Sequence, residues 1–231
     1  MSISDAPPRP DRVDWVAALV ALACLAVAAF IWRMGPPGLL PTHLDIHGRV
    51  NGWSSRAQVA ALIAGTSAVF GIIYLAMGAL SLGANPSASA HRGLRTGRLL
   101  LTLVQALVTG LIVAMSYGGA TAPGLGGGRL MPAFLSLLFL VVGAFVGKAT
   151  PNPFVGVRTY WTLRSRLAWD KSNRLAGRLF FWTGVVGLPL SLLTAPYVST
   201  PLLIVAILAS AVASVAESWR VWRTDPDRRL P

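Results

Sequence analysis

The sequence predicts an all-α integral membrane protein: a bundle of six transmembrane helices, N-in and C-in, with an ordered outer loop and a basic inner loop. Three observations support this fold class. The 231 residues are 54% hydrophobic and only 12% charged, whereas a soluble domain carries about 25% charged residues. Six apolar segments alternate with polar loops, and the Lys and Arg residues are concentrated in every second loop.

The six apolar segments have lengths close to what a membrane span needs, which is about 20 residues within a range of about 17–25. A helix is expected for each, because backbone polar groups in lipid must be satisfied within the segment. The last segment is slightly short and is expected to extend into its flanks. The segments are residues 15–32, 57–82, 99–117, 130–146, 179–197 and 201–216.

The distribution of positive charge predicts the orientation of the bundle. If the N-terminus is cytoplasmic, only four cations face outside, namely Arg33, Arg49, Arg56 and Arg129. The total is 20, so 20 − 4 = 16 face the cytoplasm, as the positive-inside rule requires. These cations would face anionic inner-leaflet lipid. The net charge of +12 therefore indicates membrane lipids as partners and no direct binding of nucleic acid.

The predicted spans contain no Asp, Glu, Lys, Arg or His. Since intramembrane ionisable groups mark proton and ion pathways, this argues against a proton-coupled transporter. The segment Gly65-Thr66-Ser67-Ala68 superficially matches an intramembrane serine-protease motif, but no span offers the base that a serine nucleophile needs. An enzyme is not expected. Small-xxx-small pairs in the second span (Ala61 with Gly65, Ser67 with Gly71) would allow close helix approach there.

The chain is expected to divide into five parts. In order they are a disordered cytoplasmic N-terminus (1–14), a first helix pair (15–82) with the outer loop 33–56, connecting loops with the third span (83–129), a module (130–216) with the inner loop 147–178, and a basic cytoplasmic tail (217–231). Residues 83–98 could form a short surface helix, and the glycine-rich stretch in 118–129 is expected to be a flexible linker. Cys24 is expected to be a buried small hydrophobe, and Pro189 is expected to kink the fifth span.

The outer loop contains three residues of metal-ligand type, His43, Asp45 and His47. Imidazole and carboxylate suit Zn²⁺, but a zinc site needs three or four ligands. No other His, Cys or acidic residue lies in an outer segment. The neighbouring glycines and prolines favour instead a structured turn in which His43 bonds to the backbone. No metal and no cofactor are expected.

The inner loop combines turn-forming residues with a helical pattern. The stretch before Thr162 is rich in Pro, Asn and Gly, and Thr162 is a candidate N-cap for a following helix. On that helix Lys171, Arg174 and Arg178 would share a cationic face. Two interpretations remain open: an interfacial helix anchored by Trp and Arg in the headgroups, or a docking surface in which Arg158 binds a carboxylate of another protein.

Two segments resemble a known family, the SdpI family of bacterial toxin-immunity membrane proteins together with an N-terminal domain of unknown function often joined to it. The outer loop LLPTHLDIHGRVNGW is similar to the N-terminal module at Pro41, His43, Asp45, Gly48, Asn51 and Trp53. The inner loop is similar to the SdpI module at Asn152, Gly156, Arg158, Thr159, Trp161, Thr162, Trp169, Asn173, Gly177 and Arg178. Tyr160 departs from the Pro that the family often has there, and Arg166 and Leu167 replace its acidic residues.

The resemblance implies a multi-pass bacterial plasma-membrane protein that gives immunity or tolerance to a secreted peptide toxin. It also implies a signal to a cytoplasmic regulator, and the lost acidic residues would favour a different regulator or none. The outer-loop residues would then sense the toxin or hold the loop, and the inner-loop residues would hold the bundle or relay the signal. Two alternatives from other classes remain: a small permease or channel for a neutral or lipid-like solute, and a non-catalytic membrane partner subunit.

Overall fold

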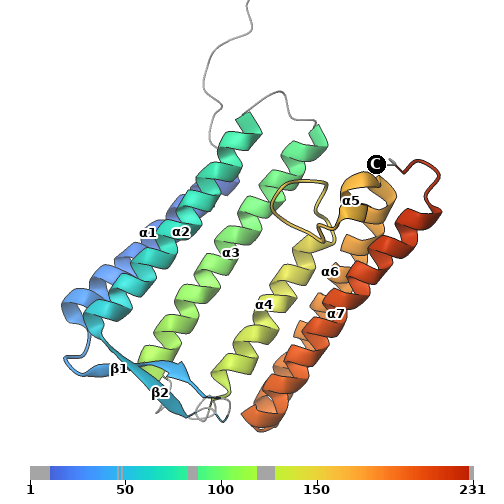
Figure 1. Ribbon diagram of the computed structural model, residues 1–231. Helices are drawn as coiled ribbons and strands as arrows, with labels where there is room; N and C mark the ends of the chain where they lie inside the picture. The colour runs from blue at the N-terminus through green and yellow to red at the C-terminus, as the bar shows by residue number, and fades with distance from the viewer. Residues whose placement is uncertain (1–10, 46, 48, 83–87, 119–127, 229–231) are drawn as a thin grey trace, which may run out of the picture.

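The structure is a computed structural model that describes residues 11–228 except 46, 48, 83–87 and 119–127. It consists of long helices and one small sheet (Figure 1). The helices are α1 (Arg12–Met34), α2 (Arg56–Leu82), α3 (Ala88–Gly118), α4 (Leu130–Val146), α5 (Tyr160–Arg164), α6 (Arg166–Leu193) and α7 (Pro196–Thr224). The two strands, β1 (Leu39–Leu44) and β2 (Val50–Ser55), pair antiparallel between α1 and α2.

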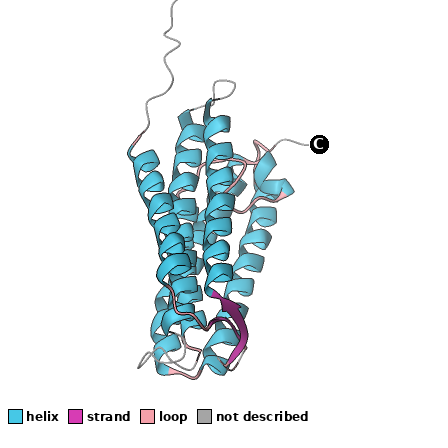
Figure 2. Ribbon diagram, turned by 90° about the vertical axis from the view of Figure 1, so that its left-hand side faces the viewer, coloured by secondary structure: helices cyan, strands magenta, loops and turns pink. Residues whose placement is uncertain are grey.

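The long helices run alternately up and down, so the chain returns repeatedly to the same two ends of the bundle (Figure 1). We call the end that carries β1 and β2 the hairpin end. The opposite end carries the starts of α1 and α3, the segment 147–165 and the end of α7, and we call it the basic end. Figure 2 shows the hairpin lying across one end of the helices.

The chain is a multi-pass membrane protein by its helices. Within the described residues, α1, α2, α3, α6 and α7 are long and apolar enough to cross a bilayer, and α4 is a shorter apolar helix of 17 residues. Large apolar side chains point outward along them, such as Leu75 at 71% and Ile72 at 67% exposure. Such a surface suits lipid, because soluble monomers rarely expose large contiguous apolar patches.

Several predicted boundaries were wrong because polar residues continue the helices. The inner loop ends at Ser165, since α6 begins at Arg166 and contains the stretch that was predicted to be a separate interfacial helix. Tyr197 belongs to α7 and not to the preceding span. The expected extension of the short last segment is confirmed, since α7 continues past residue 216 to Thr224. Of the surface helix expected in 83–98, the described residues 88–98 are the first part of the continuous helix α3. The glycine-rich linker falls largely on residues 119–127, which lie outside the described residues.

The start of α1 also differs from its prediction as part of a disordered N-terminus. Residues 1–10 lie outside the described part of the chain, but Asp11 caps α1 in a capping box with Asp14. Asp14 then forms an ion pair with Arg98 of α3 and accepts a hydrogen bond from Tyr74 of α2 at 2.7 Å. Polar contacts therefore join α1, α2 and α3 at the basic end.

The helices pack as two groups, α1–α2–α3 and α4–α6–α7, which meet where α3 contacts α4. The buried cluster of the first group lies toward the hairpin end and includes Cys24, as expected for a small hydrophobe, with Ile31, Leu40, Val59 and Ile63. Pro189 lies inside α6, which continues through it to Leu193. These interfaces position both ends of the bundle.

Within the described residues, the two glycines of the α2 pairs do not mark a close helix approach. A Cβ added to Gly65 or Gly71 would meet nothing within 4 Å. The close approach lies instead between α4 and α6, where a Cβ on Gly143 would come within 2.2 Å of the Phe181 backbone nitrogen. A Cβ on Gly184 would come within 2.4 Å of the Ser136 carbonyl oxygen of α4, and one on Gly177 within 2.7 Å of the nitrogen of Gly147, directly after α4. The glycines of this second interface determine how near α4 and α6 can lie.

Candidate functional site

The hairpin is a two-faced element at the end of the bundle. Its inward face buries Leu40 and Leu44 against the helices, and Ser116 of α3 donates a hydrogen bond to the Pro41 carbonyl at 3.4 Å. Pro41 pairs with Trp53 across the strands, and cross-strand partners share a face. That outward face exposes His43, Asn51 and Trp53, the last with 54% of its surface accessible.

His43 and Asn51 contact each other directly. The Nδ1 atom of His43 and the Oδ1 atom of Asn51 form a hydrogen bond, so the partner of His43 is a side chain and not the backbone that the sequence suggested. A Cβ on Gly52 would come within 2.7 Å of the His43 Cβ, which requires a glycine opposite this histidine. Three of the six predicted outer-loop residues thus form one exposed patch.

Asp45 builds the turn that joins the strands. Its Oδ1 atom accepts hydrogen bonds from the backbone N–H groups of Arg49 at 2.8 Å and His47 at 2.9 Å. These bonds, with the Arg49 contribution largest, lower the pKa of the Asp45 carboxyl below its usual value. Gly48 lies outside the described residues. Within the described chain no group of three His, Cys, Asp or Glu residues could hold a metal ion.

At the basic end, Asn152 closes the first turn after α4. Its Oδ1 atom accepts from the N–H groups of Phe154 and Val155, both at 2.8 Å. Its Nδ2 atom donates to the carbonyls of Thr150 at 2.8 Å and Val155 at 3.0 Å. An asparagine side chain can satisfy all of these positions at once, so Asn152 organises the loop and leaves little capacity for an external ligand.

Trp169 and Asn173 fasten the same loop to α6. Trp169 is fully buried and its Nε1 atom donates to the Ala149 carbonyl at 2.8 Å, so it does not anchor an interfacial helix in the headgroups. Asn173 accepts from the Val157 N–H at 2.7 Å and donates to the Trp169 carbonyl at 2.9 Å. Gly156, at φ +125°, provides the backbone conformation that this contact requires.

A second set of contacts attaches α5 to α7. Thr159 is the N-cap of α5 in a capping box with Thr162, and the Oγ1 atom of Thr159 lies 3.0 Å from the Ser218 hydroxyl of α7. Thr162 is therefore not the N-cap that the sequence suggested. Ser165 caps α6 and also donates to the buried carboxylate of Asp225. These bonds fix the short helix between the two long ones.

Sequence reasoning missed Ser165, Ser218 and Asp225 in this network. Ser165 could have been found, because a serine directly before a helical apolar pattern is a start signal. Ser218 and Asp225 lie 59 and 60 positions along the chain from their partners, and no local pattern reveals such pairing. The Asp14–Tyr74–Arg98 contacts were missed for the same reason.

Three predicted inner-loop residues are not part of this hydrogen-bond network. Arg158 is exposed, and in the described residues its guanidinium has neither a hydrogen bond nor an ion pair within the distances that define one. Trp161 is half-buried on α5, and Arg178 is exposed on α6. Gly177 serves packing, since a Cβ there would come within 2.7 Å of the Gly147 nitrogen. Arg158 and Arg178 are therefore the groups best placed to meet a partner.

Comparison with known proteins bears on the second half of the chain. Residues 148–216 match the sequence model described as the SdpI/YfhL protein family. An 80-residue segment is 29% identical to a protein of Bacillus subtilis (strain 168) named "Immunity protein SdpI", and covers 34% of this chain and 39% of that relative's length. In a search of the solved structures, none matches significantly. The matched residues include Asn152, Gly156, Thr159, Ser165, Trp169 and Asn173. The partners of this network on the last turns of α7, Ser218 and Asp225, and the hairpin lie outside the family match.

Proposed function

We propose, on the premise that residues 148–216 make this chain a member of the SdpI/YfhL protein family, that it gives cells immunity or tolerance to a secreted peptide toxin. The observation that carries the proposal is the match to a relative whose name is that of an immunity protein. The many apolar helices support it, since they place the chain in a membrane. The bundle would act without chemistry, through what its two ends bind.

The orientation that fits this role has both ends of the chain in the cytoplasm and the hairpin outside. The described cations of the α3 start, of residues 148–178 and of the α7 end gather at the basic end. At the hairpin end are Arg33, Arg49, Arg56 and Arg129. This asymmetry favours a basic end in the cytoplasm of a bacterial plasma membrane, with α4 as the sixth span.

The hairpin is then the element that meets the toxin. Its rigid strands present His43, Asn51 and Trp53 on one exposed face, and an exposed aromatic beside polar groups suits recognition of an amphipathic peptide. At the other end, Arg158 is the contact for a cytoplasmic regulator, because a guanidinium can bind a carboxylate in bidentate geometry. The remaining basic-end residues hold Arg158 in position.

The first test is survival of cells that express the protein under challenge by a panel of membrane-active peptides. Wild type should protect. Trp53→Ala should lower the highest peptide concentration that the cells survive about tenfold or more, the order expected for an aromatic anchor. The control is Trp15→Ala, which removes a tryptophan of similar exposure (63%) at the opposite end. Absence of protection by wild type against the whole panel would contradict the proposal.

The relay is tested separately in the same assay. Arg158→Ala should lose protection at matched abundance, whereas Arg92→Ala, an exposed arginine of α3 at the same end, should retain it. If Arg158→Ala protects as wild type does, the regulator contact is wrong and immunity stands on the hairpin alone. If both arginine variants fail alike, general loss of charge at the basic end is the cause.

A further inference from the structure

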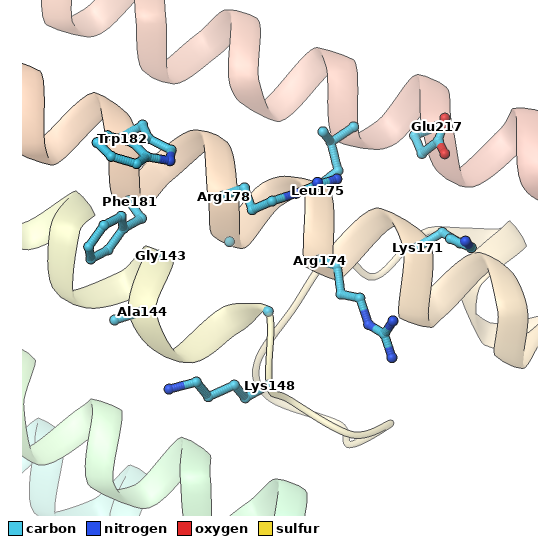
Figure 3. Close-up of a pocket in the computed structure, with 12 residues that line it drawn as sticks. Gly143, Ala144, Lys148, Lys171, Arg174, Leu175, Arg178, Phe181, Trp182 and Glu217 are labelled. Atoms are coloured by element: carbon cyan, nitrogen blue, oxygen red, sulfur yellow. The ribbon is translucent and has the colours of Figure 1, made fainter.

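An open groove of about 770 Å³ runs along α6 near the basic end and is not used by the network described above. Its floor is the close contact of α4 with α6, at Gly143, Gly147 and Gly177, and one edge is formed by α7 at Glu217. Figure 3 shows Phe181 and Trp182 toward one end of the groove, and Arg174 and Lys171 toward the other. The groove thus has an aromatic part and a cationic part.

The cationic part carries four exposed side chains, Lys148, Lys171, Arg174 and Arg178. Among the described residues none of the four forms an ion pair within 4 Å, whereas Arg98, Arg166 and Arg220 do. The acidic group in the lining, Glu217, already accepts hydrogen bonds from Arg220 at 2.7 and 2.8 Å, and Lys171 contributes to its electrostatic environment. The groove therefore has a large excess of positive charge that the chain does not neutralise.

The aromatic part lies deeper along the same helix. From Lys171 to Trp182 the α6 axis advances about 16 Å at 1.5 Å per residue, roughly half the thickness of a bilayer's hydrocarbon core. Trp182 is 60% exposed, so the groove opens to the outside of the bundle there. The closely packed glycines leave a hollow in which an aliphatic chain could lie against Phe181.

We propose that this groove is a binding site for an anionic phospholipid. The headgroup phosphate would lie among Lys148, Arg174 and Arg178, and an acyl chain would follow the hollow toward Trp182. A soluble anion would match only the cationic part, whereas a lipid matches both parts and the direction from one to the other. Basic pockets between membrane helices bind lipid headgroups in this way. The proposal goes beyond toxin immunity and does not depend on it.

The test is native mass spectrometry of the purified full chain in detergent, titrated with phosphatidylglycerol or with phosphatidylcholine of the same acyl chains. Wild type should retain one phosphatidylglycerol in preference to phosphatidylcholine. The variant Arg174→Gln/Arg178→Gln should bind phosphatidylglycerol about 30-fold more weakly, as expected for two cations near a membrane surface. The control Arg12→Gln/Arg92→Gln removes two exposed cations at the same end outside the groove and should bind as wild type does.

A second variant separates shape from charge. Ala144→Trp keeps every cation but places an indole in the groove that Ala144 lines, and it should also lose the retained lipid while circular dichroism remains unchanged. Equal weakening in the groove pair and the control pair would overturn the proposal in favour of general surface charge. Competition by soluble glycerol phosphate at concentrations similar to those of the lipid would overturn it in favour of a soluble anion. If Ala144→Trp retained the lipid, the hollow would not be where the acyl chain binds, which would contradict the proposed site.

Discussion

Gly156 and Asn173 illustrate how single residues hold the basic end together. The Oδ1 atom of Asn173 accepts from the Val157 N–H at 2.7 Å, and that bond forms only if the loop passes close above α6. A Cβ on Gly156 would lie 2.5 Å from the same Oδ1 atom and 3.1 Å from the Trp169 ring. The backbone φ of +125° at Gly156 is itself one that L side chains rarely adopt.

Gly156→Ala should therefore lower the free energy of unfolding by about 1–3 kcal/mol, the usual cost of a non-glycine residue in such a conformation. The measurement is the temperature at which helicity is lost in detergent. Gly110→Ala in α3 is the control, because a Cβ there meets nothing within 4 Å and alanine favours the helix. If the two variants have the same melting temperature, the stability of the loop does not depend on its contact with Asn173.

The sequence indicated which basic-end residues belong together but assigned several of them the wrong role. Spacing along the chain reveals local relations, such as residues on one helical face. It does not reveal that Trp169 bonds to Ala149 or that Thr159 meets Ser218, because these partners lie 20 and 59 positions away. We predicted that Trp169 and Asn173 contact lipid or a partner, whereas both side chains are buried and hydrogen-bond to the inner loop.

At the scale of helices, the apolar spans could be located from hydropathy alone, and α4 has the predicted bounds of 130–146. Helix pairing could not be located in the same way. Small residues occur in α2 as well as in α4 and α6, and lipid-facing and protein-facing surfaces are equally apolar. Only the packed structure distinguishes Gly143, where an added Cβ would meet the backbone of α6, from Gly65, where it would meet nothing within 4 Å.

This difference predicts opposite results for the same substitution. Gly143→Ala should lower the stability of the protein by about 1–3 kcal/mol, the cost of overpacking, because the Phe181 backbone cannot rotate away as a side chain would. Gly65→Ala should leave stability unchanged or raise it slightly, since alanine is the better helix former. Detergent melting of the two variants beside wild type provides the comparison, and equal losses would show that α4 and α6 are less closely packed than described.

For the whole molecule, the alternation of helices accounts for why the start of α1 and the end of α7 lie at the same end of the bundle. The hydropathy pattern was sufficient for this arrangement because each apolar segment forms one helix of nearly bilayer length. The strands of the hairpin were not predicted, since its short turn-rich sequence shows little alternation. The shortest of the long apolar helices is α4, whose 17 residues extend about 26 Å at 1.5 Å per residue, against hydrocarbon about 30 Å thick.

Labelling of single cysteines in intact cells tests both the orientation and the crossing of α4. The background is Cys24→Ala, which removes the chain's one cysteine, a buried residue. Arg49→Cys in the hairpin turn and Arg129→Cys before α4 should react with a membrane-impermeant maleimide, because both positions are proposed to be outside. Lys148→Cys after α4 and Thr224→Cys at the end of α7 should react only after permeabilisation. Labelling of Lys148→Cys together with Arg129→Cys would show that α4 does not cross the membrane. If Arg49→Cys were protected and Thr224→Cys labelled in intact cells, the orientation of the bundle would be the reverse of the proposed one, with the basic end outside.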